Sequence, residues 1–475
     1  MARSDRLAVR ATLRQWRVRA RRTTGDIAYL VYASVLVSVI VLVPIMRAAW
    51  LLLSEPAMIA ALSSPTFGPL SVAGALALMA AACAPWASPA VRPAFLARVL
   101  SESVAPLSVS LRGPVVRWWL IAVLAAVAVA ALCQGVLWNV GISSGATFAW
   151  TVASAASTAT IATALAVAAQ RSALVSNVSS GALVAVAVAV IVMSPPVFVF
   201  AEPVGALPLV VLAVLAVSLM PRLLDGLHPQ AIVAASVRRD ATAVGVVLMD
   251  SGTVADAAHE VPQGGRRLVA VPRIAPWMTY SVAAMVGALR TPARLIRGVA
   301  LLVAALALAS VASSAWGVTA AAVLAYAGLG ACMTGVRQAA LAVRTTAVYG
   351  ISDVTLVALH AIFPTIVVVV ASTAGLVGGG IGWSVALVVG VASLLARIFA
   401  ALTPPAPIAL IMPVPTPVGD LAALVRLGWA LQGAGFAVAL SLALVPAALG
   451  ADLLRFVWAP LIALALLVVR WRNRA

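Results

Sequence analysis

The chain of 475 residues contains no lysine, and only 9% of its residues are charged, whereas 64% are hydrophobic. A soluble domain needs far more charge to cover its surface, so this composition excludes a soluble globular protein and predicts a membrane protein. The lack of lysine also excludes a Walker-type phosphate loop, because such a loop places a lysine on the β- and γ-phosphates of ATP. The chain is therefore expected to have no ATP site of that kind.

Residues suited to catalysis or metal binding are also few. The sequence has three cysteines and three histidines, without a CxxC motif or a histidine cluster, so neither a disulfide framework nor a metal site is predicted. Every acidic residue lies outside the apolar runs described below. A proton-coupled transporter or an enzyme acting inside the membrane normally needs an ionisable group there. We therefore predict no catalytic residue, no cofactor and no enzymatic activity for this chain.

The sequence does contain a series of apolar runs, and a helix needs about 20 such residues to cross the hydrocarbon core of a bilayer. These runs predict an all-α, polytopic membrane protein with about 12 transmembrane helices. The runs lie at 27–46, 68–86, 115–138, 146–169, 180–200, 204–220, 298–316, 318–336, 361–377, 381–400, 427–446 and 455–470.

One long polar stretch, 221–297, separates the first six runs from the last six, and we interpret it as a cytoplasmic connector. It divides the chain into a first six-span half at 27–220 and a second at 298–475. Residues 1–26 carry eight arginines, six of which recur at steps of three or four residues. This pattern predicts a basic amphipathic helix that lies on acidic lipid headgroups.

The placement of the arginines predicts the orientation of the chain in the membrane. With the N-terminus in the cytoplasm, only Arg47 and Arg455 of the 31 arginines would lie on the outer side. Both termini are therefore predicted to be cytoplasmic. The net charge of +18 is then explained by topology, and no nucleic-acid partner is predicted.

The two halves look like parallel repeats. Aligned without gaps, 98–114 lies against 344–360, which sets Pro106 beside Ser352. Each half also has an acidic residue six positions after a proline, shortly before its last span. These pairs are Pro196 with Glu202 and Pro446 with Asp452. We predict an internal duplication that gives two six-helix pseudo-repeats.

This arrangement resembles the permease subunits of type-2 ABC exporters. Such subunits have an amphipathic interfacial helix before the first span, a coupling helix after the second and a broken outer segment before the sixth. The corresponding stretches are 5–22, 98–114 and 195–208 in the first half, and 275–296, 344–360 and 446–460 in the second. The segments 414–419 (VPTPVG) and 350–353 (GISD) are also similar to an uncharacterised twelve-span family of high-GC bacteria.

The resemblance implies a permease subunit in the bacterial inner membrane, driven by a separate ATPase. Leucines of the coupling stretch would enter a groove of the ATPase while arginines meet acids on its rim. The first coupling stretch, 98–114, is expected to bind the ATPase more strongly than the second, 344–360, because the second has an aspartate where the first has Leu107. Alternatively, both stretches could lie on lipid. The implied coupling residues are Arg98, Pro106, Leu107, Leu111, Arg112, Arg344 and Asp353.

Two other functions stay open: a secondary transporter of the major-facilitator type, and a non-transporting scaffold that anchors a partner. Major-facilitator transporters share the six-plus-six layout, but their loop after the second span is short and carries an aspartate. Here the loop 87–114 is long and has none. A stripe of hydroxyl residues on the fourth span could line a polar path or allow close helix packing. Its members are Thr147, Thr151, Ser154 and Thr158.

Overall fold

The computed structural model of the chain describes the following residues: 11, 24–37, 39–40, 43–63, 72, 75–76, 79–80, 83, 88–101, 106–172, 175–176, 178–183, 186, 203–247, 276–312, 315–343, 351–403, 415–416, 419–420, 422–448 and 453–472. This part of the chain is almost wholly α-helical, which confirms the predicted all-α class. The N-terminal helix predicted at 1–26 lies outside the described residues except for Ala11 and 24–26.

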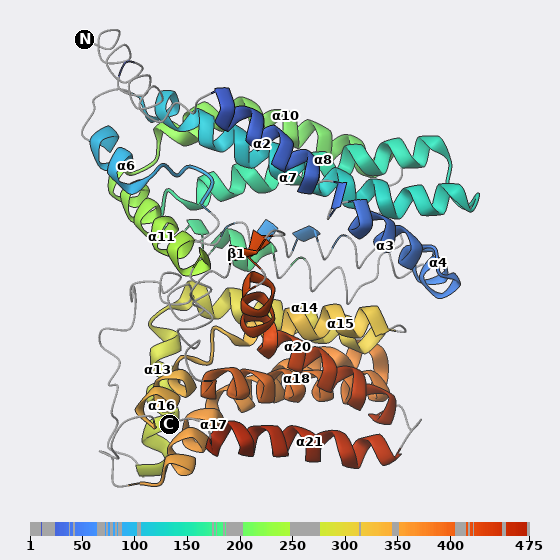
Figure 1. Cartoon of the computed structure of the whole chain (residues 1–475), viewed down its shortest axis with the longest axis vertical. Coiled ribbons are helices and arrows are strands. Elements are labelled where there is room, and N and C mark those ends of the chain that lie inside the picture. Colours follow the sequence, from blue (N-terminus) through green and yellow to red (C-terminus); the bar gives the residue numbers. More distant parts are fainter. Residues whose placement is uncertain are drawn as a thin grey trace. The chain divides into compact units, whose positions relative to one another are not determined.

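The chain divides into two compact units (Figure 1). Unit 1 comprises Met1–Ser176 and Ser194–Asp240, and unit 2 comprises Asn177–Met193 and Ala241–Ala475. The division after Asp240 falls within the polar stretch 221–297. Residues 177–193, which include part of the fifth predicted span, group with unit 2.

Unit 1 is a set of packed helices. Helix α8 contacts both α7 and α10, and the short helices α3 and α4 contact α7. A turn at 140–144 joins α7 to α8, where Gly141 has a φ of 79° and the Thr147 N–H donates to Ser144 Oγ at 3.2 Å. The helices of unit 1 are α2 (Thr24–Val37), α3 (Val43–Leu53), α4 (Pro56–Leu62), α6 (Ala94–Ser101), α7 (Leu107–Asn139), α8 (Gly145–Ala169), α10 (Pro203–Asp225) and the part of α11 (Pro229–Val247) up to Asp240.

Unit 2 is also helical, and it contains one short antiparallel pair of two-residue strands. Its elements are α13 (Pro276–Leu289), α14 (Pro292–Val311), α15 (Ala315–Leu329), α16 (Thr334–Ala342), α17 (Asp353–Ser372), the 3-10 helix η3 (Thr373–Gly378), α18 (Gly379–Leu402), β1 (Pro415–Thr416), β2 (Gly419–Asp420), α20 (Ala422–Ala448) and α21 (Leu453–Arg472).

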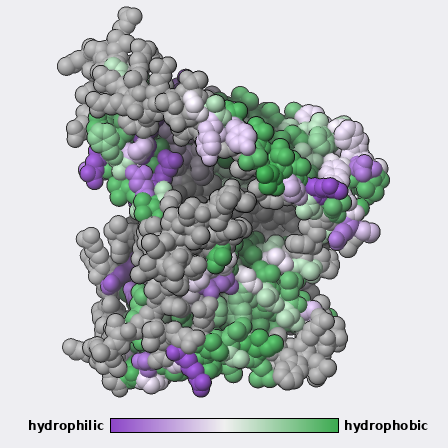
Figure 2. Space-filling view, viewed as in Figure 1, coloured by the Kyte–Doolittle hydropathy of each residue, from purple (hydrophilic) through white to green (hydrophobic). Residues whose placement is uncertain are grey.

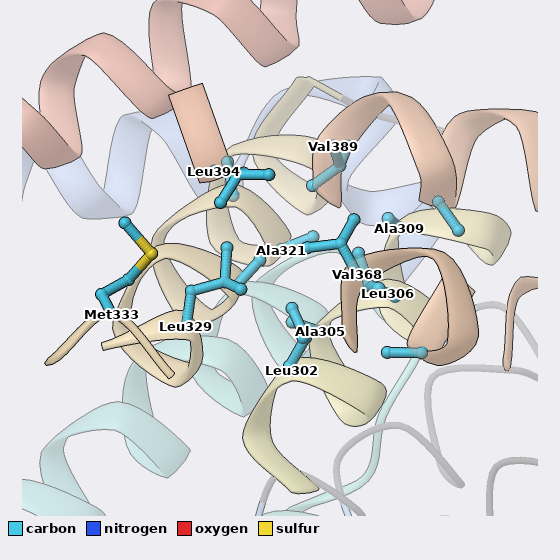
Figure 3. Close-up of a cluster of buried hydrophobic side chains, with 14 of the residues drawn as sticks. Leu302, Ala305, Leu306, Ala309, Ala321, Leu329, Met333, Val368, Val389 and Leu394 are labelled. Atoms are coloured by element: carbon cyan, nitrogen blue, oxygen red, sulfur yellow. The ribbon is translucent and has the colours of Figure 1, made fainter. Parts of the chain in front are cut away.

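The core of unit 2 is built from α14, α15, α17 and α18 (Figure 3), with fully buried side chains such as Leu302, Leu306 and Val389. Helices α14 and α15 approach closely at a pair of glycines. A Cβ atom on Gly328 would lie 2.7 Å from Gly298 O. Small residues allow such close contact between helices in membranes, where dispersion forces rather than water exclusion drive association.

Among the described residues, six helices are long and apolar enough to cross a bilayer, and there are up to eight spans if each of two bent helix pairs counts as one. The prediction of about 12 spans thus exceeds what these residues contain. The predicted spans 68–86 and 180–200 lie largely outside them. The first predicted span, 27–46, covers most of α2 and only the first turn of α3.

Apolar side chains cover much of the surface of the described helices (Figure 2). On α10, for example, Val204, Val211 and Val214 are 78%, 57% and 64% exposed. Surfaces this apolar are rare on soluble monomers, whereas they suit contact with lipid acyl chains. The surface and the helix lengths together agree with a protein embedded in a membrane.

Candidate functional site

Helix α7 is long enough to extend well beyond a bilayer. It has 33 residues, which at 1.5 Å per residue is about 50 Å, against about 30 Å for the hydrocarbon core. Trp118 and Trp138 are 41% and 55% exposed, and they lie about 30 Å apart along the helix. Tryptophans at this separation are typical of the two aromatic belts of one membrane span.

The first part of α7, residues 107–117, lies outside the section between the two tryptophans. It reaches about 16 Å beyond Trp118 along the helix axis, whereas the headgroup layer is only about 5–7 Å deep on each side. Arg112 and Arg117 are exposed on this section. In a span with its aromatic belts at Trp118 and Trp138, oriented along the membrane normal, the start of α7 would reach past the headgroup layer as a continuous helix.

Two distant aspartates cap helices that cannot cap themselves. Pro106 precedes α7 and makes no side-chain cap, but the Ser108 N–H donates to Asp225 Oδ1 at 2.8 Å. Similarly, the Ala94 N–H at the start of α6 donates to Asp240 Oδ2 at 2.8 Å. Each such cap stabilises by about 1 kcal/mol. Because Asp225 ends α10 and Asp240 lies in α11, the caps tie α6 and α7 to these two helices.

A third tie involves a proline inside α7. Pro114 has no amide hydrogen, so the carbonyl of Ser110, four residues earlier, loses its helical partner. Arg92 takes that place: its Nε donates to Ser110 O at 3.1 Å, and its Nη2 donates to the same oxygen. A buried carbonyl is thereby satisfied, and the segment before α6 is fastened to α7.

Apolar side chains fill the space between these helices. Ala97, Leu111, Leu224 and Ile232 belong to one buried cluster, with contributions from α6, α7, α10 and α11. We call this assembly of α6, residues 107–117, residues 220–225 and residues 229–240 of α11 the platform. Leu111 is only 2% exposed, and Leu107 packs half-buried against the same cluster. Both leucines thus hold the platform together and do not face outward as expected from the sequence.

The outward face of α6 is different. Its residues Leu96, Ala97 and Leu100 are buried, whereas Phe95 is 71% and Val99 43% exposed. Arg98 is exposed on the same face, because positions three and four apart are neighbours on a helix. An exposed aromatic residue beside an arginine is typical of protein interfaces. Phe95 was not predicted, because Phe95 with Val99 and Leu96 with Leu100 are both apolar pairs four positions apart, and the sequence does not show which pair is buried.

In unit 2 the corresponding helix start is built differently. Helix α17 begins at Asp353, and Ser352 caps it locally by accepting the Thr355 N–H at 3.2 Å. The predicted coupling residue Arg344 lies outside the described residues. Asp353 is half-buried. The structure therefore brings Arg98, Pro106 and Arg112 together on one platform and places Asp353 at a separate helix start.

The hydroxyl stripe of α8 lies within the bundle of unit 1. Ser154 is 2% exposed, and Thr147, Thr151 and Thr158 are half-buried. Thr151 Oγ1 donates to the Thr147 carbonyl at 2.9 Å, one turn back along the helix. Further along α8, Thr160 accepts the indole N–H of Trp119 at 3.0 Å. Back-bonding of this kind is a packing arrangement.

Arginines of unit 1 gather at one end of its long helices. Arg112 and Arg117 lie near the start of α7, Arg222 lies near the end of α10, and Arg171 follows α8. Arg171 Nε donates to the Gly226 carbonyl at 3.1 Å, so the ends of α8 and α10 meet there. The turn 140–144 at the opposite end of α7 carries no charge.

Within the described residues, no group of three or more histidines, cysteines or acids lies close enough to hold a metal ion. No protein-family model, curated protein or solved structure matches this chain.

Proposed function

We propose that this chain is the membrane-spanning permease subunit of an exporter driven by a separate ABC-type ATPase, and that the ATPase docks on the platform. The observation that best supports this is the projection of α7, about 16 Å beyond Trp118. A helix that lay on lipid would stay within the headgroup layer. The platform stands beyond that layer, where a soluble protein can reach it.

The construction of the platform suits the transmission of force. Helix α7 runs without a break from Leu107 to Asn139, so a displacement at its start would move the whole span. The caps by Asp225 and Asp240 and the bonds from Arg92 make the helices of the platform move together. A chain with no phosphate loop of its own needs such a contact to be driven by ATP.

In this proposal the outward face of α6 makes the contact. Phe95 and Val99 would enter an apolar groove of the ATPase, and Arg98 and Arg112 would meet acidic residues on its rim. Leu107 and Leu111 have the separate role of holding α6 on α7. A Leu107→Asp change would therefore disturb the platform itself, so exposed residues provide the cleaner test.

Twelve spans and an internal duplication are part of the proposal. They are supported by the register of two helices: α7 begins at Leu107 and α17 at Asp353, and these positions correspond in the gap-free alignment of 98–114 with 344–360. A short helix precedes each, α6 in one case and α16 in the other. The arginine-rich end of the helices supports a cytoplasmic platform, cytoplasmic termini and a location in the bacterial inner membrane.

The proposal is tested by purifying the full-length chain from its native membrane in mild detergent and identifying the bound proteins by mass spectrometry. The wild type should retain an ATPase. Arg98→Glu should lower the recovery of that ATPase about tenfold, since it reverses a charge at the rim of the contact. Arg47→Glu is the matched control, because Arg47 is also exposed but lies on α3.

Equal recovery of the ATPase with both variants would contradict docking on the platform. If Arg98→Glu instead releases a partner that is not an ATPase, the scaffold function is favoured and the permease proposal is wrong.

A further inference from the structure

Unit 2 contains a cluster of three arginines at the break between α15 and α16, where the helix axis bends by 71°. Arg294 comes from α14, Arg337 from α16 and Arg397 from α18. The charges of Arg294 and Arg337 lie close enough to Arg397 to repel it. Three guanidinium groups are thus gathered at a half-buried place in unit 2.

The end of α15 holds two of these guanidinium groups in place. Arg397 Nε donates to the Tyr326 carbonyl at 2.6 Å, and its Cζ lies 3.8 Å from the centroid of the Tyr326 ring. Arg294 Nη2 donates to the Gly330 carbonyl at 2.9 Å. Carbonyl groups at the end of a helix attract cations, so the arginines are positioned before any ligand arrives.

The structure also keeps room for Arg397. A Cβ atom at position 330 would lie 2.9 Å from Arg397 Nη2, so a glycine there allows the guanidinium to approach. The bonds of Arg397 use Nε and Nη2, and Nη1 makes no hydrogen bond to any described residue. That group therefore has a donor left for a ligand.

We propose that Arg294, Arg337 and Arg397 form a binding site for a phosphate group. A guanidinium matches phosphate because its planar N–H groups can donate two parallel bonds to two oxygens. Basic pockets between membrane helices on the cytoplasmic side are also where phospholipid headgroups bind. The phosphate could belong to a lipid or be free in solution, and the inference does not depend on the exporter proposal.

The test measures the thermal unfolding midpoint of the purified full-length chain in a neutral detergent. It compares added phosphatidic acid, diacylglycerol (the same lipid without its phosphate) and inorganic phosphate. Phosphatidic acid should raise the midpoint of the wild type, and diacylglycerol should not. Arg337→Gln should weaken the apparent affinity about tenfold or more, since it removes one charged donor. Arg472→Gln, a control on the exposed end of α21, should leave it unchanged.

A second variant covers the case in which Arg337→Gln does not fold. Gly330→Ala removes no charge but displaces Arg397, so it should also weaken the response to phosphatidic acid. If inorganic phosphate raises the unfolding midpoint as much as phosphatidic acid does, the ligand is a soluble phosphate. If inorganic phosphate leaves the midpoint unchanged while phosphatidic acid raises it, the ligand is the lipid. An equal response to phosphatidic acid in wild type and in whichever variant folds would overturn the site. So would an equal response to diacylglycerol.

Discussion

At the scale of single residues, the platform depends on bonds between positions far apart in the chain. Arg92 and Ser110 are 18 positions apart, Ser108 and Asp225 are 117 apart, and Ala94 and Asp240 are 146 apart. The sequence shows the need for each bond, because prolines at 93, 106 and 114 leave helix groups without local partners. It does not show which side chain meets that need, since the answer depends on how the helices pack.

The bond between Arg92 and Ser110 predicts a specific non-additivity. Arg92→Ala should destabilise the platform by about 1.5–3 kcal/mol, as expected for losing a hydrogen bond from a charged group. In a Pro114→Ala background the same change should cost clearly less, because an alanine in place of the proline would supply the missing amide hydrogen to the Ser110 carbonyl.

The measurement is the unfolding of the two single variants, the double variant and the wild type in detergent, followed by circular dichroism. Identical costs of Arg92→Ala in both backgrounds would mean that the proline and the arginine are independent.

At the scale of elements, helix identity was easier to predict than helix boundaries. The run 146–169 matches α8 at Gly145–Ala169 almost residue for residue. The run 115–138 lies inside α7, but the helix begins at Leu107, because a helix can continue into water beyond the point where apolar residues end. The run 318–336 is bent at 330–333, and its uniform hydropathy contains no sign of the bend.

The glycine contact between α14 and α15 provides a second prediction. Gly328→Ala should destabilise unit 2 by about 1–3 kcal/mol, the range of overpacking in a well-packed core, because its Cβ would lie under 3 Å from backbone atoms of Gly298 and Leu302. Gly287→Ala is the control. Nothing lies within 4 Å of a Cβ there, so removing a glycine from helix α13 should be neutral or stabilise by about 0.5–1 kcal/mol.

Both variants are compared by thermal unfolding of the purified chain. A Gly328→Ala protein as stable as the Gly287→Ala protein would show that α14 and α15 do not pack at this distance.

The projection of α7 can be measured directly. Spin labels on cysteines introduced at positions 112 and 124, in a chain whose three native cysteines are replaced, report depth in a bilayer. Arg112 and Leu124 are both exposed, so a label should fit at either place. The label at 124 should lie in the hydrocarbon core and be accessible to oxygen, and the label at 112 should be accessible to a water-soluble relaxation agent. Hydrocarbon depth at position 112 would remove the main support for the platform as a docking site.

At the scale of the whole molecule, composition alone was enough to predict a helical membrane protein, because so apolar a chain cannot cover itself with charge in water. The chain passes from unit 1 to unit 2 after Asp240, inside the polar stretch 221–297, but residues 177–193 of the predicted first half belong to unit 2. The role of α11 within that stretch was not foreseen. A polar segment looks like a linker in the sequence, but Ile232 and Asp240 make α11 part of the platform.

The central claim is that the energy for this chain comes from another polypeptide that docks on the platform. It is tested most directly by measuring ATP hydrolysis during purification from the native membrane, with this chain and its companions quantified in each fraction. We predict that hydrolysis follows a second protein and is lost when this chain is purified alone. Hydrolysis that persists in the isolated chain, in proportion to its amount, would contradict the account.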